Sequence, residues 1–91
     1  MNAYHEQKVA RNALRGAREF LKQSEIEHRN MVRNHDYMIA NRWMTEAHYA
    51  SNLMHLGKEI TAKVAKVVEA EMRLAAANAN LKEVNKSQEA G

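Results

Sequence analysis

The sequence predicts an all-α fold, a helical hairpin or three-helix unit with a long C-terminal helix. Two observations support this prediction. Pro is absent and Gly occurs only three times in 91 residues, while the helix-favouring residues Ala, Glu, Lys, Arg, Leu and Met dominate the composition. Apolar residues also recur at seven-residue intervals in the C-terminal half, which indicates a long helix packed along a supercoiled seam. A chain of this length is expected to form one domain over residues 1–91.

The predicted C-terminal helix covers residues 45–86 and would be roughly 60 Å long. One heptad row consists of Leu53, Ile60, Val67, Leu74 and Leu81. The position three residues later is occupied by Leu56, Lys63, Ala70, Ala77 and Val84, of which only Lys63 is polar. The stripe is broadened by Met54, Val64, Val68 and Ala75. A helix this long must pack on the N-terminal helices, on a second copy, or on both, and residues 87–91 are expected to fray.

Residues 1–44 are expected to form a basic helical part that begins with a helix from about Asn2 to Gln23. Helical spacing is followed by Ala3, Ala10, Ala13, Leu14, Ala17, Phe20 and Leu21. These residues define a narrow stripe rich in small side chains, which lets two helices approach closely. Gly16 is unfavourable inside a helix by about 1 kcal/mol relative to Ala, and we interpret it as a tight contact.

The boundary between the two parts is open at this level. Ser24 and Glu27 match a capping box, where a helix restarts or through which the segment simply continues. The run 34–36, Asn-His-Asp, favours a turn because Asn and Asp side chains compete for backbone hydrogen bonds. Thr45 is a second plausible helix N-cap, and the sequence does not decide between these two breaks.

A basic stripe is the most informative functional feature. Residues 1–45 contain eight basic and five acidic side chains, a net charge of +3, whereas residues 46–91 contain six of each. The stripe, which recurs every three or four residues on one helical face, consists of Lys8, Arg11, Arg15, Arg18 and Lys22. Arg29 and Arg33 extend it if the helix continues. Arg suits bidentate contacts with carboxylates or phosphates. The structural alternative is a solvated face that pairs weakly with Glu6, Glu19 and Glu25.

Aromatic and Met side chains gather in the middle of the chain. Trp, Tyr and Arg are enriched at binding hot spots, and Met adapts to irregular surfaces. Trp43 is expected in the small core where the helices meet. Tyr37 and Met38, beside the candidate turn, are expected at the surface, and with Arg42 they complete the predicted partner-binding residues.

No residue set predicts catalysis, a cofactor or a small-molecule substrate, so the chain is not expected to be an enzyme. Cys is absent, which excludes thiolate ligands and nucleophiles. His28 and His35 are seven residues apart, as are His48 and His55, and two helical turns, about 10.5 Å, are too far for one ion to bridge. No metal site is therefore predicted. No run approaches the roughly 20 apolar residues of a membrane span, and a cytoplasmic location is expected.

The opening Met1-Asn2-Ala3-Tyr4, with Gln7 following, resembles the start of the short form of the lambda-type phage Gam proteins, which inhibit a host recombination nuclease. The resemblance covers the first seven positions. Beyond Gln7 this chain is basic where that family is acidic and imitates DNA, so no functional residue carries over. The resemblance implies a small phage accessory protein that acts on host machinery, in the host cytoplasm.

Together these features predict a non-catalytic interaction protein that binds an acidic surface on a larger protein and inhibits or recruits it. The alternative is a dimeric helical protein that binds nucleic acid through the basic stripe. A chain of this size has a thin core, which favours a homo-oligomer, with a coiled-coil dimer expected.

Overall fold

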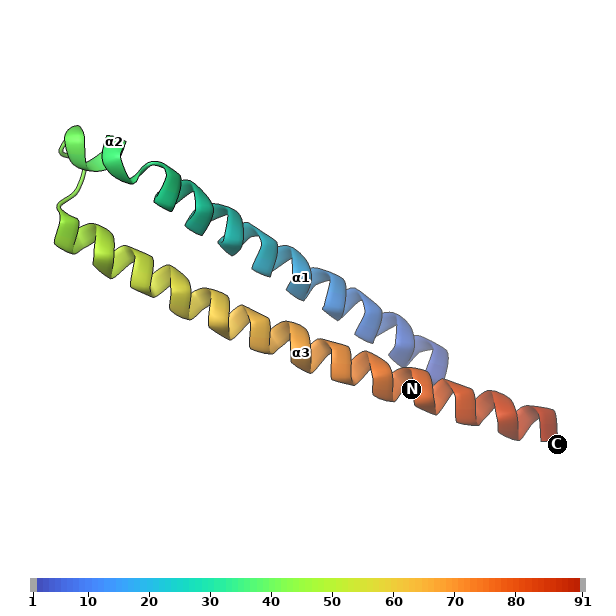
Figure 1. Cartoon of the computed structure of the whole chain (residues 1–91). Coiled ribbons are helices and arrows are strands. Elements are labelled where there is room, and N and C mark those ends of the chain that lie inside the picture. Colours follow the sequence, from blue (N-terminus) through green and yellow to red (C-terminus); the bar gives the residue numbers. More distant parts are fainter. Residues whose placement is uncertain (1, 91) are drawn as a thin grey trace.

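The structure, a computed structural model, describes residues 2–90 and contains three helices and no strand within that range (Figure 1). Helix α1 spans Ala3–Arg33, the short α2 spans His35–Ala40, and α3 spans Glu46–Ala90. Helices α1 and α3 run antiparallel as a hairpin, and α2 lies in the connection between them (Figure 1). The all-α prediction with a long C-terminal helix is therefore confirmed. Met1, the first residue of the Gam resemblance, lies outside the described residues. So does Gly91, the last residue of the tail that is expected to fray.

One seam holds the two long helices together, and its heptad pattern extends through both. On α3 all ten predicted heptad positions between Leu53 and Val84 are buried or half-buried. On α1 the matching rows are Ala3, Ala10, Ala17, Ser24 and Met31, and Gln7, Leu14, Leu21 and His28, all buried or half-buried. The first of these α1 rows consists mainly of Ala and Ser, and such small side chains let a neighbouring helix approach closely. The seam therefore combines a row of mainly small residues on α1 with a row of larger aliphatic residues on α3, from Leu53 to Leu81.

Side-chain hydrogen bonds along the seam define its antiparallel register. Near the open end, Tyr4 Oη donates to Asn85 Oδ1 at 3.0 Å and Gln7 Nε2 donates to Asn78 Oδ1 at 2.7 Å. Near the closed end, the buried Tyr49 donates its hydroxyl to the backbone carbonyl of Met31 at 3.4 Å. From the first pair to the third, the α1 residue comes later in the chain and its α3 partner comes earlier, as antiparallel packing requires.

The polar exception in the α3 heptads has a partner across the seam. Lys63 Nζ donates to the hydroxyl of Ser24, and Ser24 is 1% exposed. Ser24 therefore does not cap a helix: α1 continues through it, which is the second of the two alternatives that the sequence left open at this position. A buried hydroxyl without a partner costs about 1–3 kcal/mol, so a slip of α1 along α3 that separates these two residues is disfavoured. A single polar seam position specifies register in this way in coiled coils.

Both candidate breaks occur. Helix α1 ends at Arg33, with Asn34 between it and α2. Thr45 precedes α3, and its Oγ1 accepts a hydrogen bond from the backbone N–H of His48 at 3.1 Å, as an N-cap does. At the other end of the hairpin Asn2 caps α1, accepting from the N–H of His5 at 2.8 Å. Helix α3 continues to Ala90, past Lys86, where the sequence places its end.

The hairpin is long and thin. Its principal extents are 72 × 17 × 15 Å and its radius of gyration is 20.5 Å, against about 12 Å for a compact domain of this length. Two helices bury only the faces that meet, so many large apolar side chains stay exposed. Gly16 makes no tight contact, because a Cβ added there would meet nothing within 4 Å. No helix of the described residues is long and apolar enough to cross a membrane.

Candidate functional site

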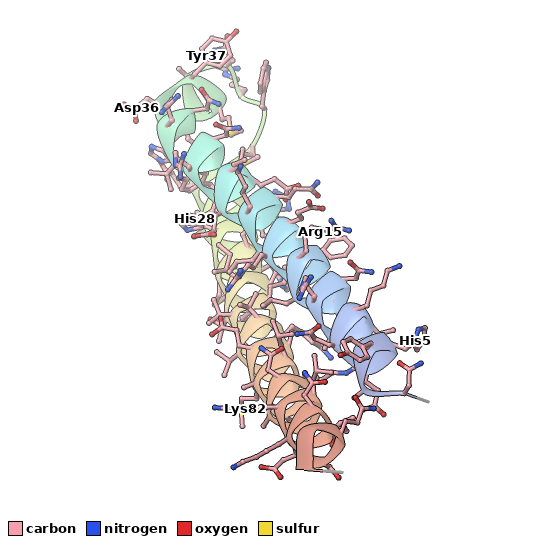
Figure 2. All side chains as sticks on the ribbon, turned by 90° about the vertical axis from the view of Figure 1, so that its right-hand side faces the viewer. His5, Arg15, His28, Asp36, Tyr37 and Lys82 are labelled. Atoms are coloured by element: carbon pink, nitrogen blue, oxygen red, sulfur yellow. The ribbon has the colours of Figure 1, made fainter. Side chains whose placement is uncertain are left out.

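The basic stripe follows one exposed face of α1. Helix α1 is unbroken through this segment, so the spacing of three and four residues places the five side chains in one row, about 21 Å long from first to last. Every member of the row is exposed: Lys8, Arg11, Arg15, Arg18 and Lys22. Arg29 and Arg33 lie on the same continuous helix and are also exposed. Figure 2 shows Arg15 projecting from the middle of α1.

The stripe carries positive charge that no ion pair compensates among the described side chains. Among the side chains that the structure describes, the ion pairs are His35–Asp36, His35–Glu46 and Lys66–Glu69. No stripe residue takes part in one. Glu6, one of the expected partners, instead accepts from Asn80 Nδ2 at 3.5 Å. Of the structural alternative, the ion pairs with nearby glutamates are absent from the described residues, whereas the solvated face itself is observed.

The stripe borders grooves between α1 and α3 on one side of the hairpin. One groove is lined by Arg11, Leu14, Arg15, Arg18, Glu19, Lys22 and Leu74, so one carboxylate lies among its four cations. A second is lined by Glu25, His28, Arg29, Val32, Arg33 and Ile60. Leu74 and Ile60 belong to the same heptad row of α3. The cations of α1 therefore lie beside that row of α3 along two segments of the hairpin.

The remaining predicted residues lie at the closed end, the tip, which we define as Tyr37, Met38, Arg42 and Trp43. The chain leaves α2 through a tight turn in which the N–H of Arg42 donates to Ile39 O at 3.1 Å and that of Trp43 donates to Met38 O at 3.0 Å. This pair of bonds is the Schellman pattern of helix ends. Arg42 occupies its left-handed position with φ 58°, where Gly or Asn is usual and another residue costs about 1–2 kcal/mol. The hydrogen bonds therefore hold an arginine where its backbone is strained.

Trp43 is not in the core. It is 65% exposed, and its ring meets that of Tyr37 edge to face, with centroids 5.2 Å apart and planes at 89°. Tyr37 is exposed as predicted, whereas Met38 is half-buried. Two antiparallel helices have no third layer to cover a side chain at the connection, which explains the exposure of Trp43.

The structure does not bring the eight predicted partner-binding residues together. Figure 2 shows Tyr37 at one end of the hairpin, His5 at the other, and Arg15 between them. The basic stripe occupies the half of α1 away from the tip. The predicted site is therefore two separate surfaces, a charged flank and an aromatic tip.

Sequence reasoning missed an exposed apolar row on α3. Met54, Val64 and Val68 broaden the heptad stripe in the sequence, yet they are 58%, 44% and 49% exposed. They lie one or four residues after members of the Leu53 row, which rotates them out of the seam toward the Ile60 and Leu74 side. The signal available in the sequence was a second seven-residue series, Met54, Thr61, Val68 and Ala75, with Val64 four residues before Val68, which is the pattern of a second face.

Sequence reasoning also missed a clasp at the closed end. His35 Nδ1 lies 2.9 Å from Asp36 Oδ1, and Nε2 lies 3.0 Å from Glu46 Oε2, while its ring meets Tyr49 edge to face at 4.4 Å. Only the protonated imidazole donates from both nitrogens. The hydrogen bonds to Glu46 and then Asp36 raise the pKa of His35 above 6.5, against a smaller opposing effect of desolvation. The clasp ties α2 to the first turn of α3.

The described residues contain no group of three or more His, Asp or Glu side chains that could hold a metal ion. No known protein family, curated protein or solved structure matches this chain.

The His35 clasp predicts a pH-dependent stability. Because the folded-state pKa is raised, the clasp contributes its full stabilisation below about pH 6.5 and loses it as pH rises through the folded value. We expect a higher melting temperature at pH 6 than at pH 8, measured by circular dichroism. His35→Gln should lose this difference, whereas His55→Gln, at an exposed histidine outside the described ion pairs, should retain it. An identical pH response in wild type and His35→Gln contradicts the assignment.

Proposed function

We propose that this chain is a non-catalytic interaction module that binds an acidic surface on a larger protein and thereby inhibits or recruits it. The observation that carries the proposal is the row of exposed cations on α1 that have no ion-pair partner among the described residues. An acidic partner supplies the missing carboxylates. Arg is well suited to this contact because its planar guanidinium binds a carboxylate through two parallel hydrogen bonds.

The tip supports the same class of function through a different kind of contact. Tyr37, Arg42 and Trp43 are exposed side chains of the types enriched at binding hot spots. The turn that presents them is fixed by backbone hydrogen bonds, so little conformational freedom is lost when a partner binds. We propose the tip as a second contact with the same partner or its complex.

The resemblance of the first seven residues to lambda-type Gam proteins supports a more specific form of the proposal. In that form the chain is a phage accessory protein that modulates a host nuclease or other host machinery in the host cytoplasm. A basic module would meet such a partner through acidic residues of the host protein, the opposite charge arrangement to an inhibitor that imitates DNA.

The second candidate function is nucleic-acid binding through the basic stripe. A row of cations some 21 Å long matches several successive phosphates. The apolar row of α3 on the same side disfavours this candidate, because phosphates and sugar edges do not cover valine and methionine side chains. The aromatic pair that could stack on bases lies at the tip, away from the stripe.

The triple variant Arg11→Gln, Arg15→Gln, Arg18→Gln tests the proposed function. It removes three charges with little change in helix propensity, so helicity should stay near native by circular dichroism. In affinity capture from the native host, read by quantitative mass spectrometry, we expect an acidic protein to be retained by the wild type and reduced at least tenfold by the variant. The matched control Lys58→Gln, Lys66→Gln, Arg73→Gln removes the same charge from exposed positions of α3 and should retain it.

Equal capture by both triple variants contradicts the proposed role of the stripe. Fluorescence anisotropy with a labelled 20-base-pair duplex separates the second candidate. Micromolar binding that falls steeply between 50 and 200 mM salt, and is lost in the stripe variant alone, would favour nucleic acid. Absence of binding at 50 mM salt eliminates it.

We also propose that two copies associate through the opposite side of the hairpin. There Phe20 is 64% exposed beside a hollow that it lines with Ala13, Gly16 and Ala17 of α1 and with Lys63 and Lys66 of α3. A projecting ring next to its own hollow suits a two-fold interface, in which each copy supplies both parts. Light scattering at tens of micromolar should give the mass of two chains, reduced to one by Phe20→Ser. A one-chain mass for the wild type contradicts the dimer.

A further inference from the structure

The side of the hairpin that carries the basic stripe also carries an unpartnered apolar row. On α3 the row consists of Met54, Gly57, Thr61, Val64, Val68 and Ala75, with the three large side chains exposed. It follows the helix for about 32 Å. Its spacing, alternately three and four residues through Val68, is that of a helix face built to pack against another helix. The only such partner within the described chain, α1, is already seated on the neighbouring face of α3.

The two rows run beside each other. Val64 and Val68 lie on α3 between Ile60 and Leu74, rotated toward the side of those two residues. Ile60 lines a groove with Arg29 and Arg33, and Leu74 lines the groove with Arg11, Arg15, Arg18 and Lys22. Cations of α1 therefore lie beside the seam residues Ile60 and Leu74, which precede and follow the Val64–Val68 segment on the same side of α3. An occupant of this side meets hydrocarbon on α3 and positive charge on α1.

We propose that this side takes an amphipathic, acidic α-helix of the partner protein, which packs an apolar row on α3, faces α1 with carboxylates, and completes a three-helix bundle. The inference rests on the proposed function and names the structural class of its partner. An apolar stripe at helical spacing is required to cover Met54, Val64 and Val68, and a row of Asp or Glu on one flank is required to neutralise the stripe.

Charge distinguishes this occupant from a second copy of the chain. The acidic residues of α3 alternate with basic neighbours, as in Lys58-Glu59 and Lys82-Glu83, and Glu69 lies 3.9 Å from Lys66. Neither long helix presents an uninterrupted acidic row that could lie along the basic stripe of another molecule. A second copy therefore does not supply the complementary charge along this side, and we assign that charge to a different protein.

The test uses three fluorescein-labelled synthetic peptides of about 20 residues and fluorescence anisotropy at 100 mM salt. The first peptide has Leu at alternating three- and four-residue spacing with Glu on both flanks of that row. The second has the same composition in scrambled order, and the third has Lys in place of Glu. We expect the first peptide to bind at least tenfold more tightly than either control. Its affinity should fall further with salt, because part of the contact is between charges.

Variants of the chain locate the binding. The double variant Val64→Ser, Val68→Ser removes two exposed side chains. It should reduce the affinity for the first peptide at least tenfold while leaving the circular dichroism of the chain unchanged. The stripe variant Arg11→Gln, Arg15→Gln, Arg18→Gln should reduce the affinity for the first peptide by a similar factor. The matched control Met72→Ser removes an exposed apolar side chain of α3 that belongs neither to the apolar row nor to the proposed dimer interface, and it should keep the affinity within twofold.

Three results overturn the inference. The most direct is an affinity for the first peptide that is no higher than the affinities for the two control peptides. A second such result is equal binding of the first and scrambled peptides, with binding of both lost in the stripe variant. It shows that the chain recognises acidity alone. The proposed function then stands, but the partner's amphipathic helix does not. A dimer that Val64→Ser with Val68→Ser converts to a monomer shows that a second copy occupies this side. The proposed function fails separately, when the stripe variant still captures the acidic protein.

Discussion

The contact between α1 and α3 along a single seam is the constraint on which the rest of this structure depends. Each helix has one face to bury and one neighbour to bury it against, and the short α2 adds no further layer. Burial of apolar surface contributes roughly 25 cal/mol per Å², so the thin seam is the main source of stability. The Lys63–Ser24 hydrogen bond introduces a polar requirement into that seam. It disfavours a shift of one helix along the other, since such a shift leaves the buried Ser24 hydroxyl without its partner.

The same geometry leaves both flanks of the hairpin open. With only two helices, residues rotated about 100° from the seam face solvent on each helix. On one flank these residues are the cations of α1 and the apolar row of α3; on the other they include Phe20 beside its hollow. A helix pair of this kind is an incomplete bundle, and the chemistry of each open flank determines what completes it. The His35 clasp and the turn at Arg42 hold the closed end, where Tyr37 and Trp43 are presented.

The sequence was sufficient for the features that depend on periodicity. The rows beginning at Leu53 and Leu56 form the α3 face of the seam, including Lys63, because a seven-residue repeat keeps these residues on one face of a long helix. Thr45 caps α3 and Asn34 ends α1, so each of the two candidate breaks is used. The basic stripe shares one face because α1 is unbroken.

Features that depend on what lies across the seam could not be read from one segment alone. Ser24 and Glu27 satisfy the local pattern of a capping box, yet the tertiary contact with Lys63 keeps α1 helical through this position. Trp43 was expected in a core that two helices are too few to form at their connection. Val64 and Val68 look like additional core residues in the sequence, and only the position of α1 shows that they lie beyond it. The partition of the eight site residues into stripe and tip likewise follows from the 72 Å length of the hairpin.

The most direct test of this account compares Val67→Asp with Val68→Asp. These neighbours have the same side chain, but Val67 is 8% exposed within the seam and Val68 is 49% exposed on the open flank. Val and Asp have similar helix propensities, so the difference between the variants reports burial. Val67→Asp places a carboxylate in the seam at a cost of several kcal/mol and should abolish most helical circular dichroism at 37 °C. Val68→Asp should change the free energy of unfolding by less than about 1 kcal/mol. Equal stability of the two variants, or greater damage from Val68→Asp, would contradict a fold held by one seam with a free flank beside it.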